Sequence, residues 1–138
     1  MKRPVRIAVL FAVLLAACGG RAAMVEHAGQ GLSVTLNAVN AARDQFMSWD
    51  EVHQKDILAA NSTRESFDAA IKAYRVKQAK VLQAFTIAYN VIGTTSAALP
   101  LVEADKMSWS DVVVDLLQVA DSVKALHTAI TDATGGSP

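Results

Sequence analysis

A seven-residue repeat of apolar side chains constrains the fold of this chain more than any other feature. One series recurs every seven residues at Phe67, Tyr74, Val81 and Ala88, and a second lies four residues behind it at Ile71, Gln78, Phe85, Ile92 and Leu99. This spacing is typical of helices that pack along one stripe in bundles and coiled coils. Gln78 is the only strongly polar residue in the stripe.

Two further segments carry a similar helical spacing on either side of this one. The earlier segment has Leu32, Leu36, Val39, Phe46, His53, Ile57 and Ala60, interrupted by Arg43 and Asp50. The later segment has Trp109, Val112, Leu116, Val119, Val123, Leu126, Ile130 and Ala133. Helices with one apolar stripe bury it against one another. We therefore predict an all-α fold, an antiparallel three-helix bundle with helices over about residues 31–60, 63–98 and 108–133.

Local signals mark the ends of the predicted helices. Asn61 offers a stop, and Ser62 with Glu65 forms a Ser-x-x-Glu capping box that starts the second helix. Pro100 is expected to end that helix, since proline lacks the backbone N–H that a helix interior needs.

A six-residue motif occurs twice, at 47–52 and again at 107–112. Each copy reads as a helix start, in which Ser48 or Ser108 is the N-cap and Glu51 or Asp111 follows three residues later. A loop precedes the second copy, so a helix start is expected there. The first copy lies within a segment that also reads as one helix. If the first helix breaks near Met47, the bundle has four elements instead of three.

The N-terminal segment has the pattern of an export signal. Lys2, Arg3 and Arg6 precede eleven uncharged residues, 7–17, which are too few to span a membrane. The last three of these residues and the next one form the run Leu15-Ala16-Ala17-Cys18. It resembles the lipobox of bacterial lipoproteins.

The resemblance implies removal of the signal peptide, residues 1–17, before Cys18. Cys18 would then carry a diacylglycerol thioether and an acylated amine, such as a palmitoylated one, and two or more acyl chains hold a protein stably on a membrane. We expect residues 18–30, with three glycines, to be a flexible tether, residues 31–133 to form the bundle domain, and 134–138 to be a disordered tail.

The predicted location is the bacterial cell envelope. In enteric-type lipoproteins a residue other than Asp after the cysteine, here Gly19, favours the outer membrane, facing the periplasm. Loss of three basic residues with the signal leaves ten against thirteen acids, so the mature chain is mildly acidic. Nucleic acid is therefore not an expected partner.

The sequence offers little that points to catalysis. It has no nucleophile elbow and no glycine-rich phosphate loop, so we expect neither an enzyme nor a bound cofactor. Asp50 and His53 share a helix face and are candidates for metal ligands. His127 with Met24 or Met47 matches the ligand types of exported four-helix cytochromes.

Three functional hypotheses follow. The first is a lipid-anchored structural or interaction protein of the envelope, of the kind that a prophage or accessory element encodes, with an envelope protein or a second copy as partner. The second is a holin-like or pore-forming protein, because residues 81–102 carry no charge over a length that could span a membrane. The third is a binder of a small ligand, haem or metal within the bundle.

Overall fold

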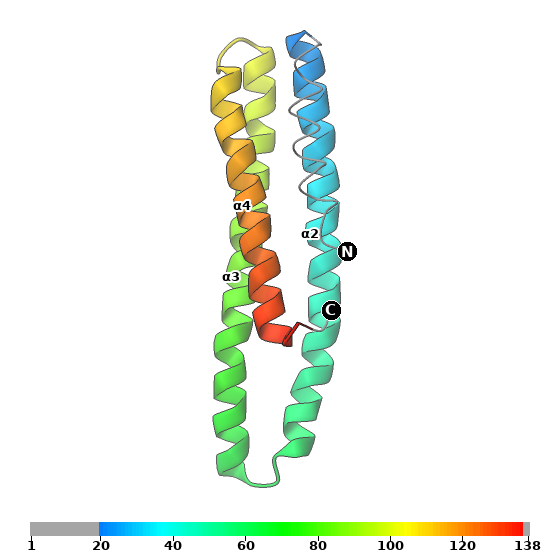
Figure 1. The fold of residues 1–138 in the computed structure, drawn as a ribbon, viewed down its shortest axis with the longest axis vertical. Helices are drawn as coiled ribbons and strands as arrows, with labels where there is room; N and C mark the ends of the chain where they lie inside the picture. Colours follow the sequence, from blue (N-terminus) through cyan, green and yellow to red (C-terminus); the bar gives the residue numbers. More distant parts are fainter. Residues whose placement is uncertain (1–19, 137–138) are drawn as a thin grey trace.

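The computed structural model describes residues 20–136, which form three α-helices joined by two short turns. These are α2 (Arg21–Ala60), α3 (Arg64–Glu103) and α4 (Trp109–Thr134). Each helix runs antiparallel to the preceding one, and together they form an elongated rod (Figure 1). The predicted all-α three-helix bundle is confirmed.

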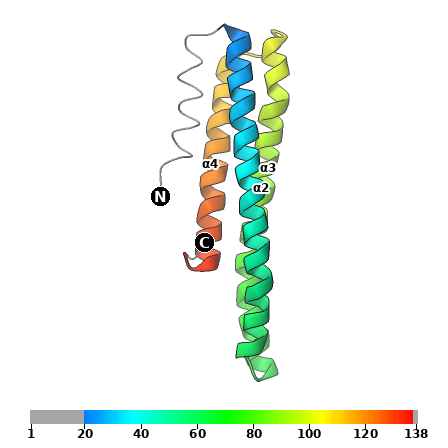
Figure 2. The ribbon, with the colours of Figure 1, turned by 90° about the vertical axis from the view of Figure 1, so that its right-hand side faces the viewer.

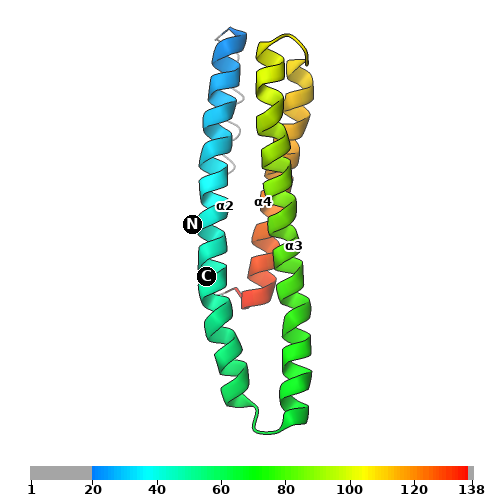
Figure 3. The same cartoon turned by 180° about the vertical axis from the view of Figure 1, so that it is seen from behind.

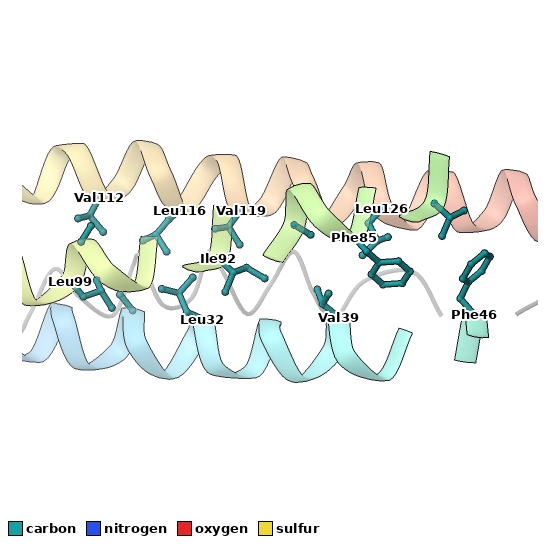
Figure 4. Packing of buried hydrophobic residues seen from close by; sticks show 14 of the residues in the cluster. Leu32, Val39, Phe46, Phe85, Ile92, Leu99, Val112, Leu116, Val119 and Leu126 are labelled. Carbon is teal, nitrogen blue, oxygen red and sulfur yellow. The ribbon is translucent and has the colours of Figure 1, made fainter. Parts of the chain in front are cut away.

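Helix α3 is the central element, because both α2 and α4 pack against it. The residues that all three helices contribute to the core are shown in Figure 4. They include Leu32 and Val39 of α2, Val81, Phe85, Ala88, Ile92 and Leu99 of α3, and Val112, Leu116, Val119 and Leu126 of α4. Each large apolar side chain buried in this way contributes about 1.5–3 kcal/mol to folding.

Helix α4 is shorter than its neighbours and covers only part of them. Ala133, the penultimate residue of α4, lines a surface hollow together with Lys77 of α3, whereas α3 begins at Arg64. The turn between α2 and α3 extends well beyond the end of α4 (Figures 1 and 3). We call residues 51–76 the hairpin end, and the remainder of the bundle the three-helix section.

Helix α2 differs from the prediction at its start and in its middle. It begins at Arg21, ten residues earlier than expected, and Ala28 is buried in the core. A flexible tether over 18–30 is therefore wrong for residues 21–30. The helix is also continuous through Met47, so the four-element alternative is wrong. Ser48 and Glu51 lie inside the helix and do not cap it, because Phe46 and Asp50 are buried against α3 on either side.

The turn between α2 and α3 is displaced by one residue from the predicted capping box. Asn61 is the C-cap of α2, and its side-chain amide donates to the Ile57 carbonyl over 2.8 Å. The N-cap of α3 is Thr63, not Ser62, and its hydroxyl accepts from the Ser66 backbone N–H. Glu65 lies in the first turn of α3, where an acid interacts favourably with the helix dipole.

Helix α3 does not end at Pro100, contrary to the prediction, but continues for one more turn to Glu103. It ends where Asp105 adopts a left-handed conformation (φ 61°) and the N–H of Lys106 donates to the Leu101 carbonyl. Helix α4 follows with Ser108 as its N-cap, which accepts from the N–H of Asp111. Gly135, at φ 70°, closes the C-terminus of α4, so Thr134, predicted as the first residue of the disordered tail, belongs to the helix.

Candidate functional site

The predicted lipidation motif, Leu15, Ala16, Ala17 and Cys18, lies outside the described residues. The first helical residue, Arg21, follows it closely and forms an ion pair with Asp105 in the turn between α3 and α4. Both side chains are largely exposed, so this pair contributes little to stability. It does show that α2 begins at the α3–α4 end of the rod, opposite the hairpin end (Figure 1).

A polar layer crosses the α2–α3 interface where the three-helix section gives way to the hairpin end. Asp50 is only 5 % exposed. The Gln78 side-chain amide donates to both of its carboxylate oxygens, over 2.9 and 2.8 Å, and the Gln54 amide donates to one of them over 3.0 Å. A buried carboxylate needs such donors, because leaving it unpaired is costly. The layer therefore aligns α2 and α3 at one register.

Aromatic side chains surround this layer. His53 stacks on Trp49 with ring centroids 4.5 Å apart, and Tyr74 of α3 lies 5.1 Å from the His53 ring. The Tyr74 hydroxyl is buried and has no hydrogen-bond partner among residues 20–136. Trp49 also contacts Phe46, which links this group to the main core.

The layer is not arranged as a metal or haem site. The Asp50 carboxylate is occupied by two glutamine amides, and His53 is engaged in stacking. Nowhere in residues 20–136 do three His, Cys, Asp or Glu side chains gather in a way that could hold a metal ion. His127 and Met47, considered as haem ligands, are exposed on different helices.

A shallow hollow lies between α3 and the C-terminal half of α4. Lys77 and Lys80 of α3 line it together with Lys124, Asp121 and Asp132 of α4. Because the hollow is open to solvent and carries charges of both signs, it does not select a ligand of one charge.

Helix α3 contains the segment considered for membrane insertion, residues 81–102. Of the described helices, α3 alone is long and apolar enough to cross a membrane, yet 39 % of its most apolar window is buried inside the bundle. Core helices of water-exposed bundles share these properties, so length and composition do not distinguish the two cases.

Sequence reasoning singled out Asp50 and Gln78 separately, as polar interruptions of two apolar stripes, but did not pair them. The signal was present, because two antiparallel helices that each carry one polar residue in an apolar stripe gain from placing the two residues opposite each other. The unpartnered Tyr74 hydroxyl had no such signal, since tyrosine occupies apolar heptad positions without contradiction.

Comparison with known proteins adds no relative from which a role could be transferred: no protein-family model matches the chain, and no curated protein or solved structure is significantly similar to it.

Proposed function

We propose that this chain is a lipid-anchored interaction protein of the bacterial cell envelope, attached through Cys18 and displaying its helical bundle to a protein partner. The lipobox-like run at 15–18 supports the anchor, because diacyl modification at this cysteine would hold the chain on a membrane without a spanning helix.

The observation that carries this proposal is that α2 begins at one end of the rod, directly after the predicted lipidation motif. Only Gly19 and Gly20 separate Cys18 from Arg21, where α2 begins. Helix α2 then runs for 40 residues, or about 60 Å, to the opposite end of the rod. An anchor at Cys18 would therefore present the hairpin end far from the membrane surface.

The proposed location is the outer membrane, on its periplasmic side, if the host is Gram-negative. This rests on Gly19 standing where an aspartate would favour the inner membrane. The expected partner is an envelope protein or a second copy of this chain.

The anchor is tested by growing cells that express the full chain with a fatty acid that carries an alkyne. The wild-type chain should incorporate the label and fractionate with membranes. Cys18→Ala should lose the label, whereas Ser33→Ala, at an exposed position inside α2, should keep it. A wild-type chain that takes up no label would refute the proposed anchor.

A second candidate function is membrane insertion through α3, favoured by the length and apolar composition of that helix. The same fractionation separates the two candidates. If Cys18→Ala loses the label yet still resists extraction from membranes at alkaline pH, insertion is supported. If it is extracted, attachment depends on the lipid.

A further inference from the structure

One side of the α2–α3 pair carries exposed apolar side chains, and those of α2 lie at the same heights along the rod as those of α3. Lys80 lines the hollow shared with α4, and Leu82, two residues later, lies about 200° further around α3. Leu82 therefore faces away from α4 and is 45 % exposed. Tyr89, seven residues on, shares this side of α3, and its hydroxyl donates to Asn40 of α2 over 2.7 Å.

A seven-residue step from the Asn40–Tyr89 pair places Met47 of α2 beside Leu82 of α3. Met47 follows Asn40 by seven residues, just as Tyr89 follows Leu82, so the two pairs are equivalent layers of one antiparallel helix pair. Met47 is 47 % exposed. We call this side the lateral face; it consists of Leu36, Asn40, Met47 and Leu58 of α2 and Ile71, Leu82, Tyr89 and Gly93 of α3.

Gly93 lies on the lateral face and would allow the backbone of another molecule to approach closely. A glycine inside a helix costs about 1 kcal/mol relative to alanine. Apart from the local backbone of α3, no atom of the described chain lies within 4 Å of the position where a Cβ would stand, so internal packing does not require a glycine here. Leu36 lies at the same height along the rod, by the same antiparallel register, and is 36 % exposed.

We propose that a second copy of this chain packs on the lateral face, related by a two-fold axis parallel to the helices. Such an axis leaves heights along the rod unchanged and places α2 of one copy over α3 of the other. Met47 would then contact Leu82 of the other copy, Leu58 would contact Ile71, and Leu36 would lie against Gly93. Each contact occurs twice.

Charge along the rim of the lateral face fits the same arrangement. Glu51 lies one turn after Met47 on α2, and Arg75 lies two turns before Leu82 on α3. The two positions differ in height by about 5 Å, which long side chains can span. Arg75 forms no ion pair with any residue of the described part of the chain. In the dimer it lies opposite Glu51 of the other copy.

The direction of the axis rests on the proposed function, because two copies anchored through Cys18 to one membrane must point the same way. Helix α4 lies on the other side of the α2–α3 pair and does not obstruct this arrangement. The result is a four-helix core made from two helical hairpins, with one α4 on each outer side.

The association is tested by sedimentation equilibrium of the full chain in detergent. We expect a dimer whose dissociation constant rises about tenfold or more in Met47→Glu and in Leu82→Glu, equivalent to about 1.4 kcal/mol. Leu117→Glu is the matched control, because Leu117 is 60 % exposed on α4 and lies off the lateral face. It should leave the dissociation constant unchanged, and circular dichroism should show equal helicity in all variants.

A monomeric wild type would overturn the proposal, as would a dimer that survives both lateral-face substitutions or is weakened equally by Leu117→Glu. Charge exchange tests the rim: Glu51→Arg should weaken the dimer, and combining it with Arg75→Glu should restore it. These measurements do not depend on lipid labelling, so failure of the dimer and failure of the anchor are distinguishable.

Cross-linking tests the axis. An equal mixture of Met47→Cys and Leu82→Cys chains should form disulfides mainly between unlike chains, because these positions face each other across the two-fold axis. An excess of links between like chains would overturn the parallel arrangement.

Discussion

Helices α2 and α3 continue with the same heptad pattern through both parts of the rod, but most of the pattern is buried in only one of them. In the three-helix section, Val81, Ala88 and Ile92 are at most 2 % exposed. In the hairpin end, Tyr74 beside the polar layer is buried, but none of residues 51–73, all of which the structure describes, is buried. Ile71 and Phe67 occupy the same heptad positions and remain half-buried.

The difference shows that the third helix, and not the heptad pattern, determines how much apolar surface is removed from water. Two helices in contact cover one side of each stripe, and α4 covers the other side only as far as Ala133 (Figure 2). Since hydrophobic stabilisation scales with the apolar area buried, the hairpin end is held mainly by its connection to the three-helix section.

The polar layer marks the boundary between the two parts. A buried carboxylate is tolerated at Asp50 because Gln78 and Gln54 satisfy it. Three aromatic rings pack beside this layer and form the last part of the core towards the hairpin end: Trp49, His53 and Tyr74.

Matched isoleucine substitutions offer the largest expected effect and test the comparison directly. Ile92 and Ile71 lie three heptads apart in one series, but Ile92 is 2 % exposed and Ile71 is half-buried. We expect Ile92→Ala to lower the free energy of unfolding by about 3–4 kcal/mol, since it leaves a cavity in a packed core, and Ile71→Ala by about 1 kcal/mol. Urea denaturation measures both. Equal losses would contradict the distinction between the two parts.

The boundary layer is the next target. Gln78→Leu should lower the free energy of unfolding by about 2 kcal/mol, because it removes the donor that bonds both Asp50 oxygens. The double variant Asp50→Leu/Gln78→Leu should lower the free energy of unfolding by less than the sum of the losses in the two single variants. A double-mutant cycle by urea denaturation gives the coupling. Strict additivity would show that the two side chains do not act together.

The helix caps sharpen the comparison at a smaller scale. Ser108→Ala removes the N-cap of α4 in the three-helix section, and we expect a loss of about 1 kcal/mol. Thr63→Ala removes the N-cap of α3 at the hairpin end, where local fraying absorbs part of the change, so the global loss should be smaller. Thermal unfolding ranks the variants. A larger loss for Thr63→Ala would mean that the hairpin end folds cooperatively with the rest.

Much of this architecture is accessible from the sequence. The three helices, their antiparallel order and most core positions follow from apolar spacing, and the N-cap at Ser108 coincides with the predicted one because a loop isolates it. Signals that compete with packing were misleading: Ser48 has the sequence of a cap but lies in a helix held by the burial of Phe46 and Asp50. Pro100 is tolerated in the last turns of α3, where one missing N–H matters less than continued packing of Val102.

Two features could not be predicted from the sequence and came only from the structure. They are the length of α2 and α3 that α4 covers, and the pairing of Asp50 with Gln78. Apolar spacing predicts that a stripe seeks a partner, but the point at which the partner helix stops depends on the register between helices. That register follows from the turn lengths and from the side chains that pack between the helices. Turn length itself is predicted imprecisely, because the N-cap of α3 is Thr63, one residue after the predicted Ser62.

The smallest expected effect concerns Glu51, at the start of the hairpin end. Its carboxylate accepts a hydrogen bond from the Lys55 ammonium over 2.8 Å, and this bond together with the positive charge lowers the pKa of Glu51 below its ordinary value of 4.5. Because the folded-state pKa is lowered, the pair's contribution is present above the unfolded value and is lost as the pH falls through the folded one. Both side chains are largely exposed, so the effect of the pair on unfolding should be slight. In an NMR titration of the side-chain carboxyl, Lys55→Ala should return the pKa of Glu51 towards 4.5. An unchanged pKa would show that the lowering comes from elsewhere, for example from Arg75 of a second copy.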